Sequence, residues 1–458
     1  MLPDQTTPST SIPEIQWPAV PTTGATVILT LQFQMQQTQW WSADRIEDHQ
    51  FRQLGLVLRH AAQHVPYYRK KFAESGFDPT DDSLRDAWTS LPILTREQVQ
   101  EAGQDLVSRA VPKSHGKLSR TQTSGSTGRP VTTYRTGFNA LLWSALTLRD
   151  HFWHRRDFAG KHAAIRAHGD GRTEPKVSER WGRSTSMVYQ TGPGALMNVS
   201  TDVDEQRRWL IDQDPLYLLT YPTNLRALAA CFAERGGRLQ SLRQVRTMGE
   251  SVPEGLHELC RQVWGVPLAD MYSSEEVGYM ALQCPDHEHY HVQSEAVYLE
   301  ILDDEGRPCP PGRVGRVVAS VLHNYAMPLI RYQIMDYAEV GEPCPCGRGL
   351  PVLNRILGRQ RNMIVLPDGT QHWPSFPAKV WTDVAPIRQF QLVQRDTNSM
   401  EARVVTDQQL TDSQTQQLVA RLNERLGHPF AIEITYMDRI ERSKSGKYED
   451  FVGLVEGE

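Results

Sequence analysis

Short β-branched runs alternate with longer amphipathic stretches through residues 100–330, and this alternation limits the architectures open to the chain more than any other feature. The run 216–221 predicts a strand, and the helical pattern that follows over 224–235 ends at a pair of glycines. A further helix is predicted over 253–263. Strands that alternate with helices are typical of α/β proteins with buried strands, so we expect an α/β body.

The C-terminal part of the chain has a different pattern. Residues 389–393 and 400–405 predict two strands, 412–426 a helix with one apolar face, and 431–436 a third strand. A ββαβ unit of this size is a small α+β domain. We therefore predict an extended leader over 1–24, a large N-terminal domain over 25–358 and a small C-terminal domain over 359–458. A chain of this length is expected to form about three domains, or one large and one smaller domain.

Charge and hydropathy exclude several classes of protein. Lys and Arg total 49 against 54 Asp and Glu, a net charge of −5, whereas nucleic-acid and anionic-membrane proteins carry a basic excess. No apolar run approaches the roughly 18 residues of a membrane span. Residues 1–24 contain no Lys or Arg, unlike a secretory signal, and six cysteines are too few for a disulfide scaffold in 458 residues. We expect a soluble cytoplasmic protein without nucleic-acid or membrane partners.

A donor-rich loop follows residue 121. Its backbone can approach a polyanion closely, and its amide and hydroxyl hydrogens can point at phosphate oxygens. A Walker loop is excluded because the required Lys is absent. By itself such a run could equally be a flexible linker. The residues of the loop are Thr123, Ser124, Gly125, Ser126, Thr127 and Gly128.

Five segments in order resemble motifs of the adenylate-forming superfamily (the acyl-CoA synthetases and adenylation domains), and most closely its phenylacetate–CoA ligase-like branch. The segments resemble, in turn, a phosphate-binding loop, an aromatic-to-glutamate motif, a segment ending in a ribose-binding Asp, the start of a hinge motif and a C-terminal lysine motif. They lie at 123–130, 271–278, 331–336, 358–359 and 445–447. One such motif is weak evidence, but five in the family's order indicate membership.

The resemblance implies roles for the nucleotide-binding residues. The loop 123–128 would hold the β- and γ-phosphates of ATP. Tyr272 would stack on adenine, with Gly249 and Glu250 along the edge of the base. Asp336 would accept hydrogen bonds from the ribose hydroxyls, and Arg359 would contact ribose or phosphate.

It also implies two catalytic residues. Glu276 would bind Mg²⁺, which prefers hard oxygen ligands. Lys447 would offer a positive charge to the negative charge shared between an attacking carboxylate and the α-phosphate, and a rotating lid domain could deliver or withdraw it. The fold implied is a large multi-layer α/β domain of the adenylate-forming type with a small α+β lid.

The chain departs from the family pattern at four positions. Glu275 places a second carboxylate beside Glu276, although the spacing favours Glu276 as the metal ligand. Met335 replaces the glycine that often precedes the Asp, so we expect a different backbone shape there. Arg361 and Asn362 stand where the hinge motif usually has two acidic residues.

Cysteines and histidines in two segments predict a second metal site. Three thiolates and one imidazole form a common tetrahedral Zn²⁺ site, and related members of the branch carry Cys and His at similar places, which implies a structural zinc. The predicted ligands are Cys284, His291, Cys344 and Cys346, with His287 and His289 as alternatives to His291. His291 is preferred because it leads into an alternating pattern over 291–301 that predicts one strand. The alternative is buried free thiols beside solvated histidines.

The function implied is ATP-dependent activation of a carboxylic acid to an acyl-adenylate, followed by transfer to a thiol, with coenzyme A as co-substrate. The branch suggests an aryl or arylacetic acid, and Trp143, Tyr189 or Tyr221 could line its pocket or simply pack in the core. ATP, Mg²⁺ and a structural Zn²⁺ are the expected cofactors. Two alternatives stay open: transfer to an amine or to a carrier protein's phosphopantetheine, and a non-catalytic, zinc-stabilised homologue. A homodimer is left open as well.

Overall fold

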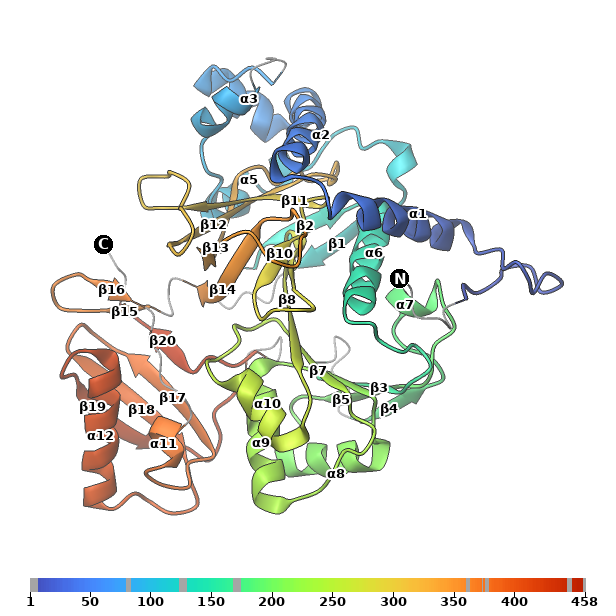
Figure 1. Ribbon diagram of the computed structural model, residues 1–458. Coiled ribbons are helices and arrows are strands. Elements are labelled where there is room, and N and C mark those ends of the chain that lie inside the picture. Colours follow the sequence, from blue (N-terminus) through green and yellow to red (C-terminus); the bar gives the residue numbers. More distant parts are fainter. Residues whose placement is uncertain are drawn as a thin grey trace.

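A mixed sheet of 12 strands forms the body of the protein (Figure 1). The computed structural model describes residues 7–79, 84–122, 130–167, 174–359, 363–372, 374, 379–442 and 447–455. The strands of the sheet are β3 (His162–Arg166), β4 (Lys176–Ser178), β5 (Gly194–Asn198), β6 (Tyr217–Thr220), β7 (Gln244–Met248), β8 (Leu268–Ser274), β9 (Gly278–Gln283), β10 (Tyr290–Val292), β11 (Val297–Leu302), β12 (Val314–Val321), β13 (Tyr332–Val340) and β14 (Val352–Arg359).

The sheet has a parallel half and an antiparallel half. Its order is β11-β12-β13-β14-β10-β9-β8-β7-β6-β3-β5-β4. Strands β5, β3, β6, β7 and β8 pair in parallel, as the alternation of strands and helices predicted. From β8 through β9, β10, β14, β13 and β12 to β11 every pairing is antiparallel. The predicted α/β class is confirmed.

Helices cover both faces of the sheet. They are α1 (Thr23–Thr38), α2 (Ala43–His64), α3 (Pro66–Ser75), α4 (Leu84–Ala87), α5 (Arg96–Ala102), α6 (Gly137–Trp153), α7 (Arg183–Ser186), α8 (Val203–Gln213), α9 (Pro222–Arg235) and α10 (Leu256–Trp264), with 3₁₀ turns η1 (Trp88–Ser90), η2 (Gly103–Leu106) and η3 (Lys113–His115). Strands β1 (Ser119–Gln122) and β2 (Thr132–Arg135) form a separate hairpin.

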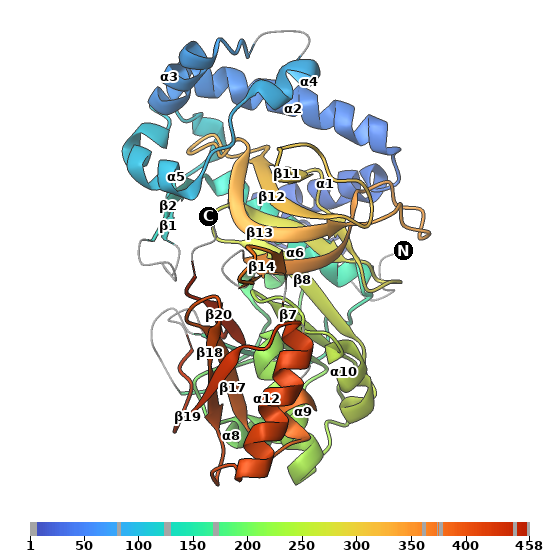
Figure 2. The same cartoon turned by 90° about the vertical axis from the view of Figure 1, so that its left-hand side faces the viewer.

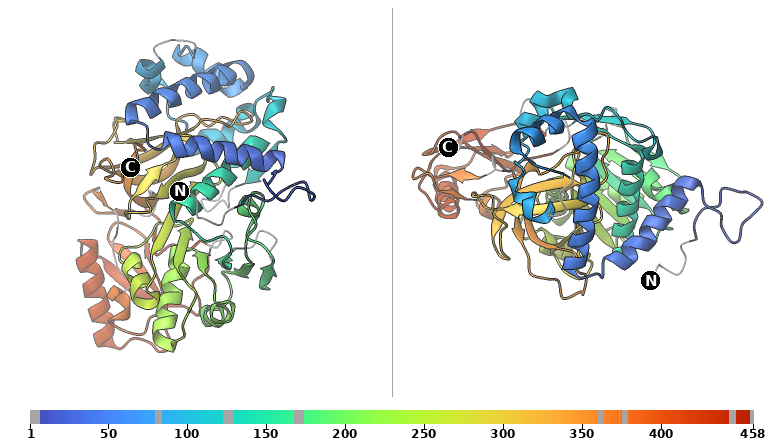
Figure 3. Two further views of the ribbon diagram at one scale, coloured as in Figure 1. Left: turned by 45° about the vertical axis from the view of Figure 1, so that its right-hand side comes forward. Right: turned by 90° about the horizontal axis from the view of Figure 1, so that it is seen from above.

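Alternate residues of the parallel strands enter different cores. Tyr217 of β6 packs with α1 and α6, whereas the next residue, Leu218, packs with α8, α9 and α10. Successive strand residues point to opposite faces, so these two helix groups lie on opposite sides of the sheet. Helices α1 and α6 run side by side (Figure 3). Helices α2 and α3 pack instead on the antiparallel half.

The C-terminal region, residues 363–455, has its own sheet and its own apolar core. Its elements are β15 (Ile364–Val365), β16 (Gln371–His372), α11 (Lys379–Thr382), β17 (Gln389–Gln394), β18 (Ser399–Val405), α12 (Asp412–Leu426), β19 (Ala431–Tyr436) and β20 (Phe451–Gly453). Four strands form a sheet in the order β19-β18-β17-β20. The region lies beside α9 of the body (Figure 2). A boundary between 358 and 359 stays a prediction.

Sequence patterns located most of these C-terminal elements correctly. The predicted strands, and the helix over 412–426, match β17, β18, β19 and α12 to within a residue. Helix α12 begins at a capping box of Thr411 and Gln414 and ends at Gly427, which has φ 70°. The fourth strand, β20, was not predicted; it pairs in parallel with β17.

The single strand predicted over 291–301 is wrong. The chain forms β10 and β11 instead, with a turn between them in which the N–H groups of Ala296 and Val297 both donate to the carbonyl of Gln293. Among the described residues, no helix is both long enough and apolar enough to cross a membrane.

Candidate active site

Tyr272 and Asp336 meet although their strands are not neighbours in the sheet. Tyr272 lies on β8 and Asp336 on β13, with β9, β10 and β14 between them. The Tyr272 hydroxyl donates a 2.9 Å hydrogen bond to Oδ2 of Asp336, so the sheet curves to bring these strands together. An aromatic ring beside a carboxylate offers a stacking surface for a purine and an acceptor for sugar hydroxyls.

Glu276 lies in the turn between β8 and β9, and its side chain is buried. Arg96, the first residue of α5, donates from Nη1 to Oε1 of Glu276 at 3.0 Å. The side chain of Glu275 is 62% exposed, and its Oε2 lies 3.6 Å from Nη2 of Arg135. The two adjacent carboxylates therefore have different surroundings, and only that of Glu276 is enclosed.

The backbone next to Asp336 is strained. Met335 has φ 73°, in the left-handed region that favours glycine. On the paired strand, Gly358 has φ 86°, and a Cβ added there would lie 2.8 Å from Oγ of Ser251. Glycine is therefore needed at 358, and the segment that carries Ser251 packs directly against β14.

Lys447 reaches the body from the C-terminal region. A Cβ added at Gly249 would lie 3.4 Å from Cε of Lys447 and 3.5 Å from Cε1 of Tyr221. The lysine side chain thus lies against Gly249, and the Tyr221 ring lies against the same glycine. Because Ser251 contacts Gly358, the short segment 249–251 has Lys447 on one side and the β13–β14 pair, which carries Asp336, on the other.

Protein donors occupy both oxygens of the buried Glu250 carboxylate. Oε2 accepts hydrogen bonds from the main-chain N–H of Thr223 at 3.0 Å and from its hydroxyl at 2.8 Å. Oε1 accepts a 2.6 Å bond from the main-chain N–H of Tyr448. Burial raises the pKa of Glu250, while the Tyr448 N–H and the charge of Arg442 oppose that rise. The role expected for Glu250 at the edge of adenine stays a prediction.

The phosphate-binding loop expected at 123–128 lies outside the described residues, as do Arg361 and Asn362. The side chain of Arg359 also lies outside them, and its backbone is the register partner of Asp336.

The three aromatic residues considered for an acid pocket have different surroundings. The ring of Trp143 on α6 lies 4.2 Å from the ring of Tyr279, centroid to centroid. Tyr221 lies against Gly249, as described above. Tyr189 is buried against Phe158 at 5.3 Å, which is the core role that the sequence left open.

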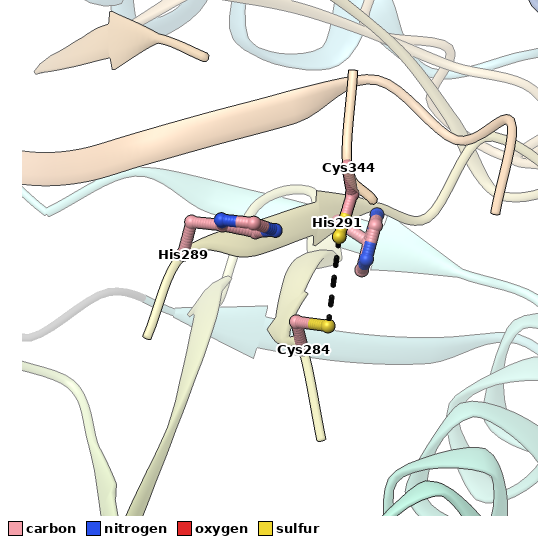
Figure 4. A group of neighbouring side chains, drawn as sticks. All are labelled: Cys284, His289, His291 and Cys344. Carbon is pink, nitrogen blue, oxygen red and sulfur yellow. Dashed lines mark hydrogen bonds between the residues drawn. The ribbon is translucent and has the colours of Figure 1, made fainter. Parts of the chain in front are cut away.

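A separate cluster of thiols and imidazoles lies beside β10 (Figure 4). One potential ligand atom from each of Cys284, His289, His291 and Cys344 lies within 4.8 Å of all the others. The sulfur atoms of Cys284 and Cys344 are 3.9 Å apart, and the His289 ring points toward them (Figure 4). Sγ of Cys346 is 3.4 Å from Nε2 of His291. Three of the four predicted ligands therefore form this group with His289, and the fourth, Cys346, lies beside His291.

The chemistry of this cluster fits a soft cation such as Zn²⁺. Nε2 of His289 and Nδ1 of His291 are buried without a hydrogen-bond partner among the described residues. Burial lowers the pKa of His291 to about 3, so its imidazole is neutral. Burial raises the pKa of the Cys344 thiol to about 12. A metal ion would give these two ring nitrogens the partner that they lack among the described residues.

The loop after Cys346 is fixed to the helical layer. A Cβ added at Gly349 would lie 1.7 Å from the carbonyl oxygen of Trp41, so only glycine fits. The guanidinium of Arg348 lies 5.0 Å from the ring of Trp40 and 4.7 Å from that of Trp153. The cluster therefore joins the sheet to the junction of α1 and α2, as a structural site would.

Curated relatives cover most of the chain. A phenylacetate-coenzyme A ligase of Pseudomonas putida is 24% identical over 367 residues, which are 76% of this chain and 77% of the relative. One from Thermus thermophilus is 24% identical over 327 residues, covering 68% and 70%. A family model described as the CapK C-terminal domain matches residues 375–452.

Solved structures show the same architecture. A 2-hydroxyisobutyryl-CoA ligase in its postadenylation state matches with a TM-score of 0.71 at 17% identity, over 91% of both chains. The same enzyme in its thioesterification state matches with a TM-score of 0.58 at 18% identity, again over 91% of both chains. An anthranilate CoA ligase matches with a TM-score of 0.53 at 17% identity, over 73% of this chain and 66% of the other. The chain therefore has the fold of these ligases.

Within the adenylate-forming fold, motif order located Tyr272, Glu276, Asp336 and Lys447, and the structure shows that Tyr272 contacts Asp336 and that Lys447 contacts Gly249. Sequence reasoning missed the partners of these residues. Arg96 is 180 positions from Glu276 in the chain. No local pattern marks such an arginine, and only the folded sheet reveals its role.

Proposed function

We propose that this protein activates a carboxylic acid with ATP to form an acyl-adenylate and pyrophosphate, and then transfers the acyl group to the thiol of coenzyme A. The observation that carries the proposal is the position of Lys447 against Gly249, on the segment that packs against the β13–β14 pair. This arrangement gathers a cation, a ribose acceptor and an aromatic ring, which are the groups that adenylation requires.

In the first half-reaction, a carboxylate oxygen of the acid attacks the α-phosphorus of ATP, and pyrophosphate leaves with its bonding electrons. Tyr272 and Asp336 hold the adenosine, and the loop 123–128 holds the β- and γ-phosphates. The ammonium of Lys447 stabilises the negative charge that builds on the α-phosphate, a contribution of about 3 kcal/mol for one well-placed donor. Glu276 is the protein ligand for Mg²⁺, which neutralises phosphate charge when bound.

In the second half-reaction, the thiol sulfur attacks the acyl carbonyl carbon, its proton is lost and AMP leaves. Lys447 has no role in this step, so its withdrawal would open the site to the thiol. The TM-score is higher against the postadenylation state than against the thioesterification state of the same ligase, which favours the adenylation arrangement for this structure.

The acid is of the aryl or arylacetic class. The rings of Trp143 and Tyr279 pack together in the core beside α1 and α6, whereas Tyr221 packs in the core of α8, α9 and α10, so these rings do not carry the assignment. The names of the curated relatives support the same class.

The cluster of Cys284, His289, His291, Cys344 and Cys346 is a structural zinc site. Four of these five residues would fill a tetrahedral Zn²⁺ site and leave no position for substrate, and the loop after Cys346 is fixed against Trp41.

The test is acid-dependent exchange of pyrophosphate into ATP, measured over a panel of aromatic and aliphatic acids. We expect exchange with aromatic acids, and a loss of at least about 100-fold in Lys447→Ala. Lys70→Ala is the matched control, because that side chain is 77% exposed. Exchange that survives in Lys447→Ala would exclude the proposed role of the lysine, and no exchange with any acid would favour a non-catalytic homologue.

The acceptor is tested separately. Acyl-adenylate formed by the protein is offered free coenzyme A, a phosphopantetheinylated carrier protein or an amine. Thioester formation with coenzyme A is the expected result. If product forms only with the carrier protein or only with the amine, the proposed adenylation step stands and the proposed acceptor, coenzyme A, is wrong.

A further inference from the structure

The C-terminal region and helix α9 share a partly buried ion pair. Nη1 and Nη2 of Arg226 donate to the two carboxylate oxygens of Asp450, each at 2.7 Å. The Arg226 guanidinium also lies 4.7 Å from the centre of the Phe390 ring on β17. Both charged side chains are at most 20% exposed. A bidentate Arg–carboxylate pair fixes the orientation of the two side chains as well as their distance. It therefore sets the angle at which the C-terminal region meets the body.

The Glu250 carboxylate makes a second connection between the body and the C-terminal region. One of its oxygens is held by Thr223 at the start of α9, and the other accepts the main-chain N–H of Tyr448. Arg442 of the C-terminal region donates to Oγ1 of Thr223 at 3.1 Å, and its Nη1 lies 3.9 Å from Oε1 of Glu250. The Glu250 carboxylate therefore joins a residue of the body to two residues of the C-terminal region.

Both connections hold the chain just after Lys447. Tyr448 is the next residue, its hydroxyl donates to the carbonyl of Phe390, and Asp450 follows two positions later. The carbonyl of Asp450 accepts from the N–H of Leu392 at 2.8 Å, and β20 begins at Phe451. The body thus holds the chain beside the lysine at two points, the main-chain N–H of Tyr448 and the carboxylate of Asp450.

We propose that Glu250 is a positioning residue that presents Lys447 to the α-phosphate, and that the Arg226–Asp450 pair is the second point of the same clasp. The proposal rests on the proposed function for the role of Lys447. The clasp consists of Glu250, Tyr448, Arg226 and Asp450. It holds only while the C-terminal region is docked on α9, so withdrawal of Lys447 for thioester formation requires it to open.

The clasp predicts unequal effects on the two half-reactions. Glu250→Gln and Asp450→Asn remove one charge each and keep the size of the side chain. We expect pyrophosphate exchange to fall at least about 10-fold in both variants, whereas thioester formation from supplied acyl-adenylate is unchanged or faster in Asp450→Asn. The matched control is Glu258→Gln on α10, where the side chain is 55% exposed, and it should alter neither rate.

Charge reversal gives a stricter test of the pair. Arg226→Asp and Asp450→Arg alone should each lower pyrophosphate exchange, and the double variant should recover part of the loss. If the double variant is no better than the worse single variant, the pair is not the second point of the clasp.

Hydrogen–deuterium exchange tests the clasp without any substrate. We expect the peptide 447–453 to exchange at least about 10-fold faster in Glu250→Gln and Asp450→Asn than in the parent protein, with no change in Glu258→Gln. Unchanged protection in the first two variants would overturn the clasp. Faster peptide exchange with equal losses in both half-reactions would overturn the positioning role. If the parent protein exchanges no pyrophosphate, the proposed function fails and the deuterium result still decides whether the clasp exists.

Discussion

Arg96 of α5 donates a 3.0 Å hydrogen bond to the carboxylate of Glu276, and both side chains are at least nine-tenths buried. A buried carboxylate without a counter-charge is strongly disfavoured, so Arg96 supplies the charge partner that holds the Glu276 side chain in place. A metal ion bound at Glu276 would share that carboxylate with Arg96. This pairing distinguishes Glu276, the carboxylate that the spacing favoured, from its exposed neighbour Glu275.

Glu276→Gln should lower the rate of pyrophosphate exchange by about 100-fold and raise the Mg²⁺ concentration needed for half-maximal rate. The amide oxygen of Gln can still accept the hydrogen bond from Arg96, so the fold should persist. Exchange measured across a Mg²⁺ titration checks the prediction. Glu275→Gln is the matched control, with a side chain 62% exposed, and it should change the rate by less than about threefold. The reverse order of effects would assign the metal to Glu275.

Met335→Gly should raise the free energy of unfolding by about 1 kcal/mol, although glycine in the middle of a strand usually lowers it. The reason is that Met335 has φ 73°, a conformation that costs a bulky residue more than the entropy lost by glycine. Urea denaturation measures the change. Gln333→Gly, two positions earlier on β13, has no positive φ to relieve and should lose about 1 kcal/mol. Equal losses in both variants would show that Met335 is not strained.

Tyr272 and Asp336 are in contact, whereas the loop expected at 123–128 lies outside the described residues. The bounds of α12 were predicted because a capping box, an apolar face and a closing glycine mark them. In contrast, the turn between β10 and β11 is held by a distant residue. Nε2 of Gln50 on α2 donates to the carbonyl of Ser294 at 2.9 Å, so the alternating pattern over 291–301 hides a turn that tertiary contacts stabilise.

Long-range charge pairs were the main features that the sequence could not supply. Arg226 and Asp450 are 224 positions apart, and each looks like an ordinary surface residue in its own segment. Which arginine meets which carboxylate is decided by how the C-terminal region docks on α9. The same holds for the metal cluster, where periodicity suggested His291 and only the fold showed that His289 reaches the same sulfur atoms.

Asp270→Asn should remove a pH-dependent loss of stability. Asp270 on β8 is buried, and its two oxygens accept from the hydroxyls of Thr247 at 2.6 Å and Tyr290 at 2.9 Å. Burial raises its pKa to about 7, although these hydrogen bonds oppose the rise. Because the folded pKa exceeds the unfolded value of about 3.9, this group stabilises the fold fully below about pH 4 and loses that contribution as the pH rises through about 7.

The asparagine stays neutral, so the variant should gain stability relative to the parent as the pH rises from 4 to 8, by up to about 4 kcal/mol. Free energies of unfolding in urea at four or five pH values provide the measurement. Asp407→Asn, with a side chain 71% exposed, is the control and should follow the parent curve. Parallel curves for the parent and Asp270→Asn would show that Asp270 ionises normally.

Metal analysis should find about one zinc per chain, and a chelator should lower the melting temperature because a closed site stabilises the folded state. Cys344→Ser should lose the metal, whereas Cys231→Ser, outside the cluster, should keep it. The cluster has five possible ligands for four positions, and His289 and Cys346 are the alternatives for the fourth. The variants His289→Ala and Cys346→Ser distinguish between them. The variant that loses zinc identifies the fourth ligand, since the other residue can then only neighbour the site. Zinc retained in Cys344→Ser would contradict the site itself.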